Sequence, residues 1–322
     1  MNSRPQSTGS PTPAARIVIA GAAHIDRSGW LAAPSALGCS NPGQFDERPG
    51  GTALNIARNL ATLRARVDLI SLVGQDAAGN WLRDEIKAHG ITAHLEGGNT
   101  GEVHTGTYTS IIEPDGSLLV AVADMAIYEA FAFDAARHPV GELAQSDWLC
   151  VDTNLPPSEV TKMLGASRAK KAGVTVSSAK APRLRTFASM LDVVFTNISE
   201  AKALCGFDLA NDKPMADIAA GLASLGIDKT VISQGDQPVT VIEAGKISQL
   251  TVEPISEVAD VTGAGDALVG ASLFALTHGH DLVDAVAYGI NAARATIQTR
   301  GAINANLAEQ IGWPSAAAGG QG

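Results

Sequence analysis

The feature that most constrains the fold of this chain is a regular alternation of short β-branched runs with longer helical patterns. The runs lie at Ile17 to Ala20, Val67 to Val73, Trp148 to Val151, Val174 to Val176, Val193 to Thr196 and Thr230 to Ser233. The helical patterns lie at Thr52 to Leu63, Ala77 to His89, Ser158 to Lys171, Met215 to Leu225, Asp266 to Leu276 and Leu282 to Thr299. This alternation predicts an α/β fold with a doubly wound, mostly parallel sheet and helices on both faces. Ligands of such sheets bind beyond the carboxyl ends of the strands.

Two segments break the alternation. Residues 28–48 have little helical periodicity, and residues 105–124 are typical of a hairpin around the turn E-P-D-G. Together they predict a small β-sheet outside the main one, acting as a lid over the site. The alternative is an ordinary surface hairpin and loop.

Length, charge and cysteine usage limit the classes of function. With 322 residues and 45% hydrophobic content, the chain can form one large core with an added lobe, or two modest domains. The net charge of −10 argues against nucleic acid or an anionic membrane as the principal partner. Three scattered cysteines fit a reducing compartment, and neither a membrane span nor a signal peptide is evident, so we expect a cytoplasmic protein. Residues 1–15 are expected to be a disordered leader and residues 314–322 a flexible tail, around a domain at 16–313.

The loop D-V-T-G-A-G-D-A-L-V-G, from Asp260 to Gly270, places glycines where a helix begins. It has neither the lysine of a Walker A loop nor the spacing of a dinucleotide fingerprint. The N–H groups of Gly263, Ala264 and Gly265 can form an anion hole for a transferring phosphoryl group. Asp266 can then accept a proton from an attacking hydroxyl, although from the loop alone it can equally be a helix cap.

Three further clusters carry polar groups at strand ends or helix starts. In R-P-G-G-T-A-L-N, Gly50 and Gly51 allow hydroxyls to approach the backbone and Asn55 can bind a diol, unless this is only a glycine turn before an exposed asparagine. In G-A-A-H-I-D, Asp26 can hold two vicinal hydroxyls, or belong to a strand-end turn. In T-N-I-S-E, Asn197 and Glu200 can reach a phosphate and a magnesium-bound water, or Ser199 and Glu200 can simply belong to the start of a helix.

With these motifs in one order, the chain resembles the ribokinase-like (PfkB) family of sugar and nucleoside kinases over about Arg16 to Leu307. G-G-T-A-L-N-I-A, L-V-G-Q-D, T-N-I-S-E and D-V-T-G-A-G-D carry the resemblance. It implies a doubly wound α/β domain with a β lid, ATP as phosphoryl donor, Mg²⁺, and a primary hydroxyl as acceptor.

The resemblance also implies roles for individual residues. Asp266 matches the catalytic base and Gly263, Ala264 and Gly265 the anion hole, while Asp26, Gly50, Gly51 and Asn55 match positions that hold ribosyl hydroxyls. Asn197 and Glu200 match the phosphate and magnesium motif. Ser233, Gly235 and Asn291 fall where the family places the nucleotide. Asp260 and Thr262 occupy positions beside a potassium ion that many members use.

Within the family, the most similar subgroup phosphorylates pseudouridine at its 5′-hydroxyl. S-N-P-G, T-G-T-Y, A-V-A-D-M and V-S-S-A-K-A carry this finer likeness, and Ser40, Thr107, Asn154 and Lys180 are candidates for reading the uracil edges. One departure is His24, which stands where the family commonly has asparagine. It is either a neighbour that points away from the ligand or an altered contact to sugar or base.

Two alternatives to this function remain open. One is a kinase for another ribosyl substrate, namely ribose, inosine, adenosine or uridine. The other is a catalytically silent, kinase-like binding protein, which has no need of the base Asp266. For partners we expect the small-molecule nucleoside and ATP, and a homodimer formed through the lid.

Overall fold

A computed structural model describes residues 16–96, 103–145, 147–255 and 257–313. The expected leader (1–15) and tail (314–322) lie outside the described residues. Within the described residues, no helix combines the length and the apolar character that crossing a membrane requires.

The large sheet confirms the predicted α/β class. In the described residues it contains nine strands in the order β13-β12-β11-β10-β9-β8-β1-β4-β5. All neighbouring pairs from β5 to β11 are parallel, and only β12 and β13 are antiparallel additions at one edge. The strands are β1 (Arg16–Ala20), β4 (Arg66–Leu72), β5 (Thr92–Glu96), β8 (Trp148–Asp152), β9 (Lys170–Val174), β10 (Val193–Asn197), β11 (Lys229–Ser233), β12 (Val239–Glu243) and β13 (Lys246–Leu250).

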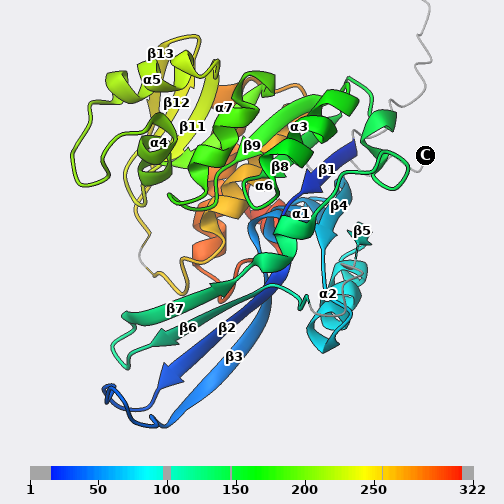
Figure 1. Cartoon of the computed structure of the whole chain (residues 1–322). Coiled ribbons are helices and arrows are strands. Elements are labelled where there is room, and N and C mark those ends of the chain that lie inside the picture. The colour runs from blue at the N-terminus through cyan, green and yellow to red at the C-terminus, as the bar shows by residue number, and fades with distance from the viewer. Residues whose placement is uncertain (1–15, 97–102, 146, 256, 314–322) are drawn as a thin grey trace, which may run out of the picture.

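Helices cover both faces of this sheet because alternate side chains of each strand point to opposite sides (Figure 1). In β1, Ile17 and Ile19 join one buried core, whereas Val18 and Ala20 join the other. The first core is covered by α1 (Thr52–Thr62), α2 (Ala77–Ala88), α6 (Ala264–Thr277), α7 (Leu282–Ile297) and α8 (Leu307–Gln310). The second is covered by α3 (Pro157–Ala166), α4 (Ile198–Cys205), α5 (Met215–Ser224) and the 3₁₀ helices η1 (Ala126–Ala130), η2 (Pro139–Glu142), η3 (Ala181–Thr186) and η4 (Ala188–Met190).

One stretch was predicted wrongly. The helix expected over Ser158 to Lys171 ends at Ala166, and the strand expected over Val174 to Val176 is β9, which begins at Lys170. Lys170 pairs with Trp148 of β8 and its ammonium lies 5.6 Å from the centre of that ring. Lys170 and Lys171 begin β9 at the amino-terminal end of the strand, where Lys170 is exposed and Lys171 is half-buried. In the sequence, these two lysines therefore look like the solvent-exposed face of a helix.

A second sheet of four strands projects from the large one, below it in Figure 1. Its order is β3-β2-β6-β7, from β2 (His24–Leu31), β3 (Gly43–Gly50), β6 (Thr107–Ile112) and β7 (Leu118–Asp124). The predicted hairpin is confirmed, since β6 and β7 pair antiparallel across the E-P-D-G turn. We call this four-stranded sheet the small sheet.

The topology fixes where a site can form. The chain runs from β1 to β4 on one side and later returns to β8 on the other, so the strand order reverses between β1 and β8. Such a switch point leaves a crevice beyond the strand ends. The small sheet begins directly after β1, so it stands beside this crevice.

Candidate active site

The glycine loop forms the start of helix α6. Gly263 is the N-cap, with φ of 78°, and a Cβ there would lie 2.4 Å from the Cβ of Ala302. A side chain is therefore excluded both by conformation and by space. The helix begins at Ala264, so the backbone N–H groups of Gly265 and Asp266 belong to the first turn, which has no intrahelical acceptors. The capping alternative for Asp266 is wrong, because no side chain caps this helix.

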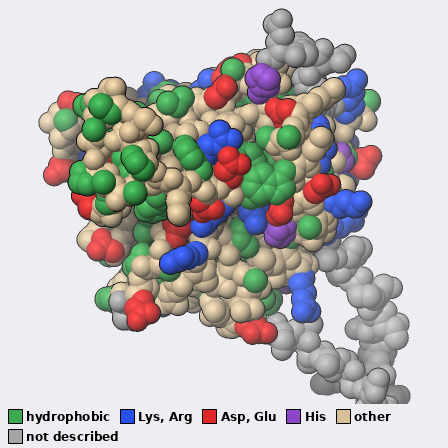
Figure 2. Space-filling model, turned by 90° about the horizontal axis from the view of Figure 1, so that it is seen from below, with side chains coloured by type: hydrophobic (Ala, Val, Ile, Leu, Met, Phe, Trp, Pro, Cys, Tyr) green, Lys and Arg blue, Asp and Glu red, His purple; other side chains and the backbone are tan. Residues whose placement is uncertain are grey.

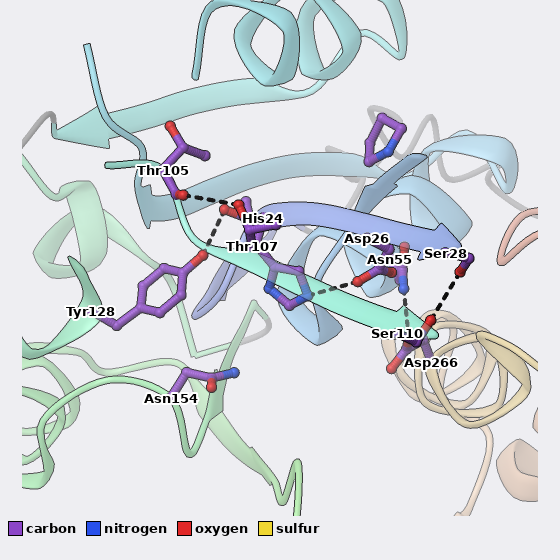
Figure 3. A network of polar contacts seen from close by, with 12 residues as sticks. His24, Asp26, Ser28, Asn55, Thr105, Thr107, Ser110, Tyr128, Asn154 and Asp266 are labelled. Atoms are coloured by element: carbon purple, nitrogen blue, oxygen red, sulfur yellow. Dashed lines mark hydrogen bonds and ion pairs between the residues drawn. The ribbon is translucent and has the colours of Figure 1, made fainter. Parts of the chain in front are cut away.

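Asp266 faces the site with a perturbed carboxyl group. Its Oδ2 accepts a hydrogen bond of 2.9 Å from Nδ2 of Asn55 (Figure 3). Burial raises the pKa of Asp266 to about 7, the Asn55 hydrogen bond opposes this rise, and the negative charges of Asp152, Asp26 and Glu200 add to it. A carboxylate with that pKa is partly ionised at neutral pH and can both accept and release a proton.

Asn55 lies in α1, and the structure corrects the idea that it is exposed. Only 4% of its surface is accessible, and its Oδ1 is buried without a hydrogen-bond partner among the described residues. Gly51, the N-cap of α1, has φ of 101°, and a Cβ there would lie 2.4 Å from the carbonyl oxygen of Ala22. Asn55, which we predicted to bind a diol, is thus held against Asp266, and its Oδ1 remains available to accept a hydrogen bond.

Asp26 lies on β2, at the root of the small sheet. A Cβ on Gly50 would come within 2.0 Å of Oδ2 of Asp26, so the carboxylate rests directly against the glycine backbone. Its Oδ1 lies 3.1 Å from Nε2 of His24 (Figure 3). The side chain of His24 therefore contacts Asp26, a residue predicted to hold the sugar hydroxyls. Nδ1 of His24 is buried and has no hydrogen-bond partner in the described part of the chain.

Asn154 and Lys180, predicted to read the base, contact each other after β8. Nζ of Lys180 donates to Oδ1 of Asn154 over 2.7 Å, and Nδ2 of Asn154 donates to Oδ2 of Asp152 over 3.1 Å. Burial lowers the pKa of Lys180 and raises that of Asp152. Asp152 is buried at the end of β8, next to the turn that follows β1.

Helix α4 places a second acidic group beside the catalytic loop. Asn197 caps the helix, its side chain accepting from the N–H of Glu200 over 2.9 Å, so the helix-start reading of this motif is confirmed. Glu200 is buried and accepts a hydrogen bond from the hydroxyl of Thr175. A cavity of about 190 Å³ joins these groups to α6. Its polar lining includes Thr52, Asn197, Glu200, Ser233, Gly265 and Asp266.

The loop before α6 forms the wall of a larger cavity. This space of about 790 Å³ lies between the small sheet and the loops at 259–262 and 300–303. Asp260 accepts from the N–H groups of Thr262 and Gly301 over 2.9 and 3.1 Å. A guanidinium nitrogen of Arg48, on β3, lies 3.7 Å from the same carboxylate. Asp260 therefore connects two loops by hydrogen bonds, and the guanidinium group of Arg48 lies beside its carboxylate.

Three predicted residues lie apart from these clusters, and a fourth, Thr107, lies on β6 beside β2. Ser40 is exposed in the loop that joins β2 to β3, at the end of the small sheet away from the large one (Figure 1). Thr107 begins β6 and donates to the carbonyl oxygen of Thr105 over 3.3 Å. Gly235 is exposed in a turn, and Asn291 is exposed on α7. None of the four lines either cavity described above.

Three residues were missed by sequence reasoning: Asp152, Thr175 and Arg48. Asp152 is the last residue of β8 and Thr175 directly follows β9, so their position at strand ends was an available signal. Arg48 offers no local signal, because its relation to Asp260 spans two distant segments of the chain.

Taken together, the site contains a carboxylate of raised pKa at an open helix N-terminus. A buried glutamate lies in one adjoining cavity, and a second aspartate lies on a separate sheet. This arrangement can bind an anion at α6, hold hydroxyl groups at Asp26, and accept a proton at Asp266.

Comparisons with known proteins agree with this geometry. The family model described as "pfkB family carbohydrate kinase" matches residues 14–309. A pseudouridine kinase of Escherichia coli (strain K12) is 31% identical over 256 residues, covering 79% of this chain and 81% of the relative. A ribokinase of Haemophilus influenzae is 28% identical, covering 79% and 82%. The solved structure of a carbohydrate kinase from Agrobacterium tumefaciens superimposes with a TM-score of 0.78 at 31% identity, covering 92% and 97%.

Proposed function

The chain belongs to the pfkB family of carbohydrate kinases, and on that premise we propose that it transfers the γ-phosphoryl group of ATP to the 5′-hydroxyl of pseudouridine. The products are ADP and pseudouridine 5′-phosphate. The observation that carries the kinase chemistry is Asp266, a carboxylate with a pKa of about 7 in the first turn of α6, held by Asn55.

In the proposed reaction, Asp266 accepts the proton of the attacking 5′-hydroxyl as its oxygen bonds to the γ-phosphorus. The bond between that phosphorus and the bridging oxygen breaks, and ADP leaves with the electron pair. The N–H groups of Gly265 and the residues beside it stabilise the negative charge of the transferring group. Because the ionised form of Asp266 is required, the rate rises with pH through about 7. A silent binding protein would gain nothing from such a group.

The residues of the smaller cavity fit a nucleotide phosphate chain with a magnesium ion. Glu200 is buried, lines this cavity, and has no ion-pair partner among the described residues, which leaves a negative charge available to a cation or its water. Bound Mg²⁺ would neutralise charge on the phosphate oxygens. Asn197 and Ser233 line the same cavity and would hold the nucleotide, whereas Gly235 and Asn291 would need to approach it on binding.

A potassium ion beside the anion hole is a separate proposal, on which the transfer above does not depend. The Asp260 carboxylate already accepts from two backbone N–H groups and has Arg48 beside it. A potassium ion there would therefore rely on Thr262 and backbone carbonyls.

Pseudouridine is proposed as acceptor for two reasons. The relative of that activity is 31% identical over most of both chains, and Asn154 and Lys180 present matched polar groups near the turn that leads to Asp26. Ribose is the second candidate, because the ribokinase relative covers the same share of the chain at 28% identity. Uracil carries donors and acceptors that ribose lacks, so only a nucleoside kinase needs the polar pair.

The test is a screen of ATP consumption with purified protein. Pseudouridine, uridine, inosine, adenosine and ribose are compared at equal concentration, with and without potassium. Highest kcat/KM for pseudouridine is the expected result. Higher kcat/KM for ribose would replace the substrate assignment and leave the kinase assignment intact, whereas no ATP consumption with any acceptor would contradict the kinase itself.

We also propose that the small sheet closes over the nucleoside and pairs with a second copy of the chain. By strand register, Phe45, Ile111, Val120 and Val122 share the face opposite Asp26, and Phe45 and Val122 are each 65% exposed. Seen from below, hydrophobic side chains lie exposed between charged groups (Figure 2). Val122→Glu should shift a dimer to monomer in light scattering, and an unchanged mass would exclude this face as the interface.

The cytoplasm is the proposed location, because ATP is available there. Its reducing conditions also suit three cysteines that are all free.

A further inference from the structure

A buried carboxylate with no role in the transfer step lies at the switch point between β1 and β8. Asp152 ends β8, is 2% exposed, and has no ion-pair partner among the described residues. Burying a charge is costly unless hydrogen bonds satisfy it. The hydrogen bonds of the Asp152 carboxylate therefore indicate its role.

Three N–H groups converge on the two oxygens of Asp152. Oδ1 accepts from the backbone N–H of Asn154 over 2.8 Å. Oδ2 accepts from the backbone N–H of Ala22 over 2.9 Å and from Nδ2 of Asn154 over 3.1 Å. Both oxygens face donors, so these hydrogen bonds favour the ionised form and oppose the rise in the pKa of Asp152 that burial causes.

The first consequence concerns the side-chain amide of Asn154. In the structure the NH₂ of Asn154 faces Asp152 and its Oδ1 faces the opposite way, which is the orientation that suits a carboxylate accepting on both oxygens. That oxygen meets Nζ of Lys180 at 2.7 Å. If the amide were flipped, an NH₂ group would meet the ammonium. Asp152 thus fixes where Lys180 is held, through Asn154.

The second consequence concerns Lys180 itself. It is half-buried, and an ammonium has three N–H donors. One donor is used by Asn154, and the structure gives the ammonium no other hydrogen-bond acceptor among the described residues. The remaining donors are available to an acceptor atom of a ligand.

The third consequence concerns the turn after β1. A Cβ on Gly21 would lie 2.2 Å from the Asp152 carboxyl group, so the turn packs directly on this acid. Asp152 also holds the N–H of Ala22, and the chain reaches Asp26 four residues later. The Asp152 carboxylate therefore supports two parts of the site. One is the segment that leads to Asp26, and the other is the pair Asn154 and Lys180, which we predicted to read the base.

We propose that Asp152 is a positioning residue for the acceptor substrate, acting through Asn154 on Lys180 and through Ala22 on the segment that carries Asp26. This inference rests on the proposed function, since it assigns Lys180 to the acceptor and not to ATP. It predicts that Asp152 controls the KM of the acceptor with little effect on the KM of ATP.

A double-mutant cycle tests the coupling. Asp152→Asn places an NH₂ group against one of the three donors, and Lys180→Met removes the ammonium. Each change should raise the acceptor KM by ~10-fold, and the double variant should show about the larger single effect instead of their product, because the two residues act in one chain of contacts. The KM of ATP should change by less than ~2-fold. Multiplicative effects would overturn the proposal.

Asp68→Asn is the matched control. Asp68 is equally buried, at 2% exposed, but it is the third residue of β4, away from the carboxyl end of the strand, where it contacts Arg16 and His94. It should lower the melting temperature and leave the acceptor KM within ~2-fold. An equal rise of KM in this control would show that the Asp152 effect is a general loss of stability.

A second variant and a ligand-free measurement keep the test decisive if Asp152→Asn folds poorly. Asn154→Ala breaks the chain of contacts without touching the acid and should raise the acceptor KM by a similar ~10-fold; wild-type KM would overturn the proposal. In the free wild-type protein, the side-chain amide protons of Asn154 should exchange at least ~10-fold more slowly than those of the exposed Asn291, by NMR. Equal exchange would contradict the contact.

Failure of the proposed function is seen separately. The kinetic cycle uses the acceptor that wild type phosphorylates best, and a wild type without turnover on pseudouridine refutes only the substrate assignment. The exchange measurement needs no substrate at all.

Discussion

The large sheet and the small sheet supply the site in different ways. Every residue of β8 is buried, whereas six of the seven residues of β7 are exposed and the seventh is intermediate. The polar groups at the ends of β8 and β10 are held by several contacts, as Asp152 is by three N–H groups. Among the described residues, the carboxylate of Asp26 on the small sheet has one hydrogen-bonding side-chain partner, His24. The comparison teaches that polar groups at the strand ends of the large sheet are held by more contacts than Asp26 on the small sheet.

The largest expected effect comes from the large-sheet side. Asp266→Asn should keep the fold and nucleotide binding while lowering kcat by ~10²-fold or more, because the proton acceptor is lost. Steady-state kinetics and a nucleotide titration measure the two quantities. Near-normal turnover would remove Asp266 from the role of base.

The same variant has a second, opposite expected effect on stability. The unfolded carboxyl loses its proton near its ordinary pKa of 3.8, whereas the folded one keeps it until about 7. The folded state therefore binds more protons between these values, and wild-type stability falls as the pH rises through this window. The amide that Asp266→Asn introduces does not titrate, so the variant should gain in melting temperature relative to wild type between pH 5 and pH 8. A constant difference would mean that the pKa of Asp266 is not raised.

The next effect tests the inner face of the small sheet. Gly50→Ala puts a Cβ 2.0 Å from the Asp26 carboxylate and should raise the acceptor KM by ~10-fold, since Asp26 must move. Gly29→Ala is the matched change on the other face, where the nearest atoms are side-chain ends of Ile111 and Phe45 at 3.0 Å. It should leave KM within ~2-fold. Equal effects would show that the two faces do not differ in function.

A smaller effect concerns the contact between α1 and α6. Asn55→Ala removes the hydrogen bond that lowers the pKa of Asp266, so the acidic limb of the profile of kcat/KM against pH should move to higher pH. Asn59→Ala is the control, since Asn59 lies one turn later in α1, donates to backbone oxygens and should leave the limb in place when removed. If the limb moves in Asn59→Ala, or does not move in Asn55→Ala, the hydrogen bond from Asn55 does not determine the pKa of Asp266.

The smallest expected effect is on motion. Adding pseudouridine should slow hydrogen exchange over residues 105–124 by ~5-fold and leave β1 and β8 unchanged, because only the small sheet has room to become more ordered. Exchange is followed by mass spectrometry with ADP present throughout. Unchanged protection of residues 105–124 would count against closure of a lid.

Much of this fold could be predicted from local pattern. The strands around Ile17 and Val193 and the hairpin at residues 105–124 were predicted because period-two and period-3.6 repeats are properties of neighbouring residues. The strand starting at Lys170 was not, because charged residues at the start of a strand and on a helix surface look alike in sequence.

For the site, the sequence by itself determined which residue types follow the strands and that Gly263, Gly50 and Gly51 precede helices or close turns. Only the tertiary structure decided which of them meet. Asn55 and Asp266 are 211 positions apart and share a hydrogen bond, Asp152 joins the turn at Ala22 across 130 positions, and Ser40 and Asn291 lie apart from both cavities. The physical reason is that a motif fixes local backbone geometry, whereas contacts between distant segments follow from strand order and from how the helices pack on the sheet.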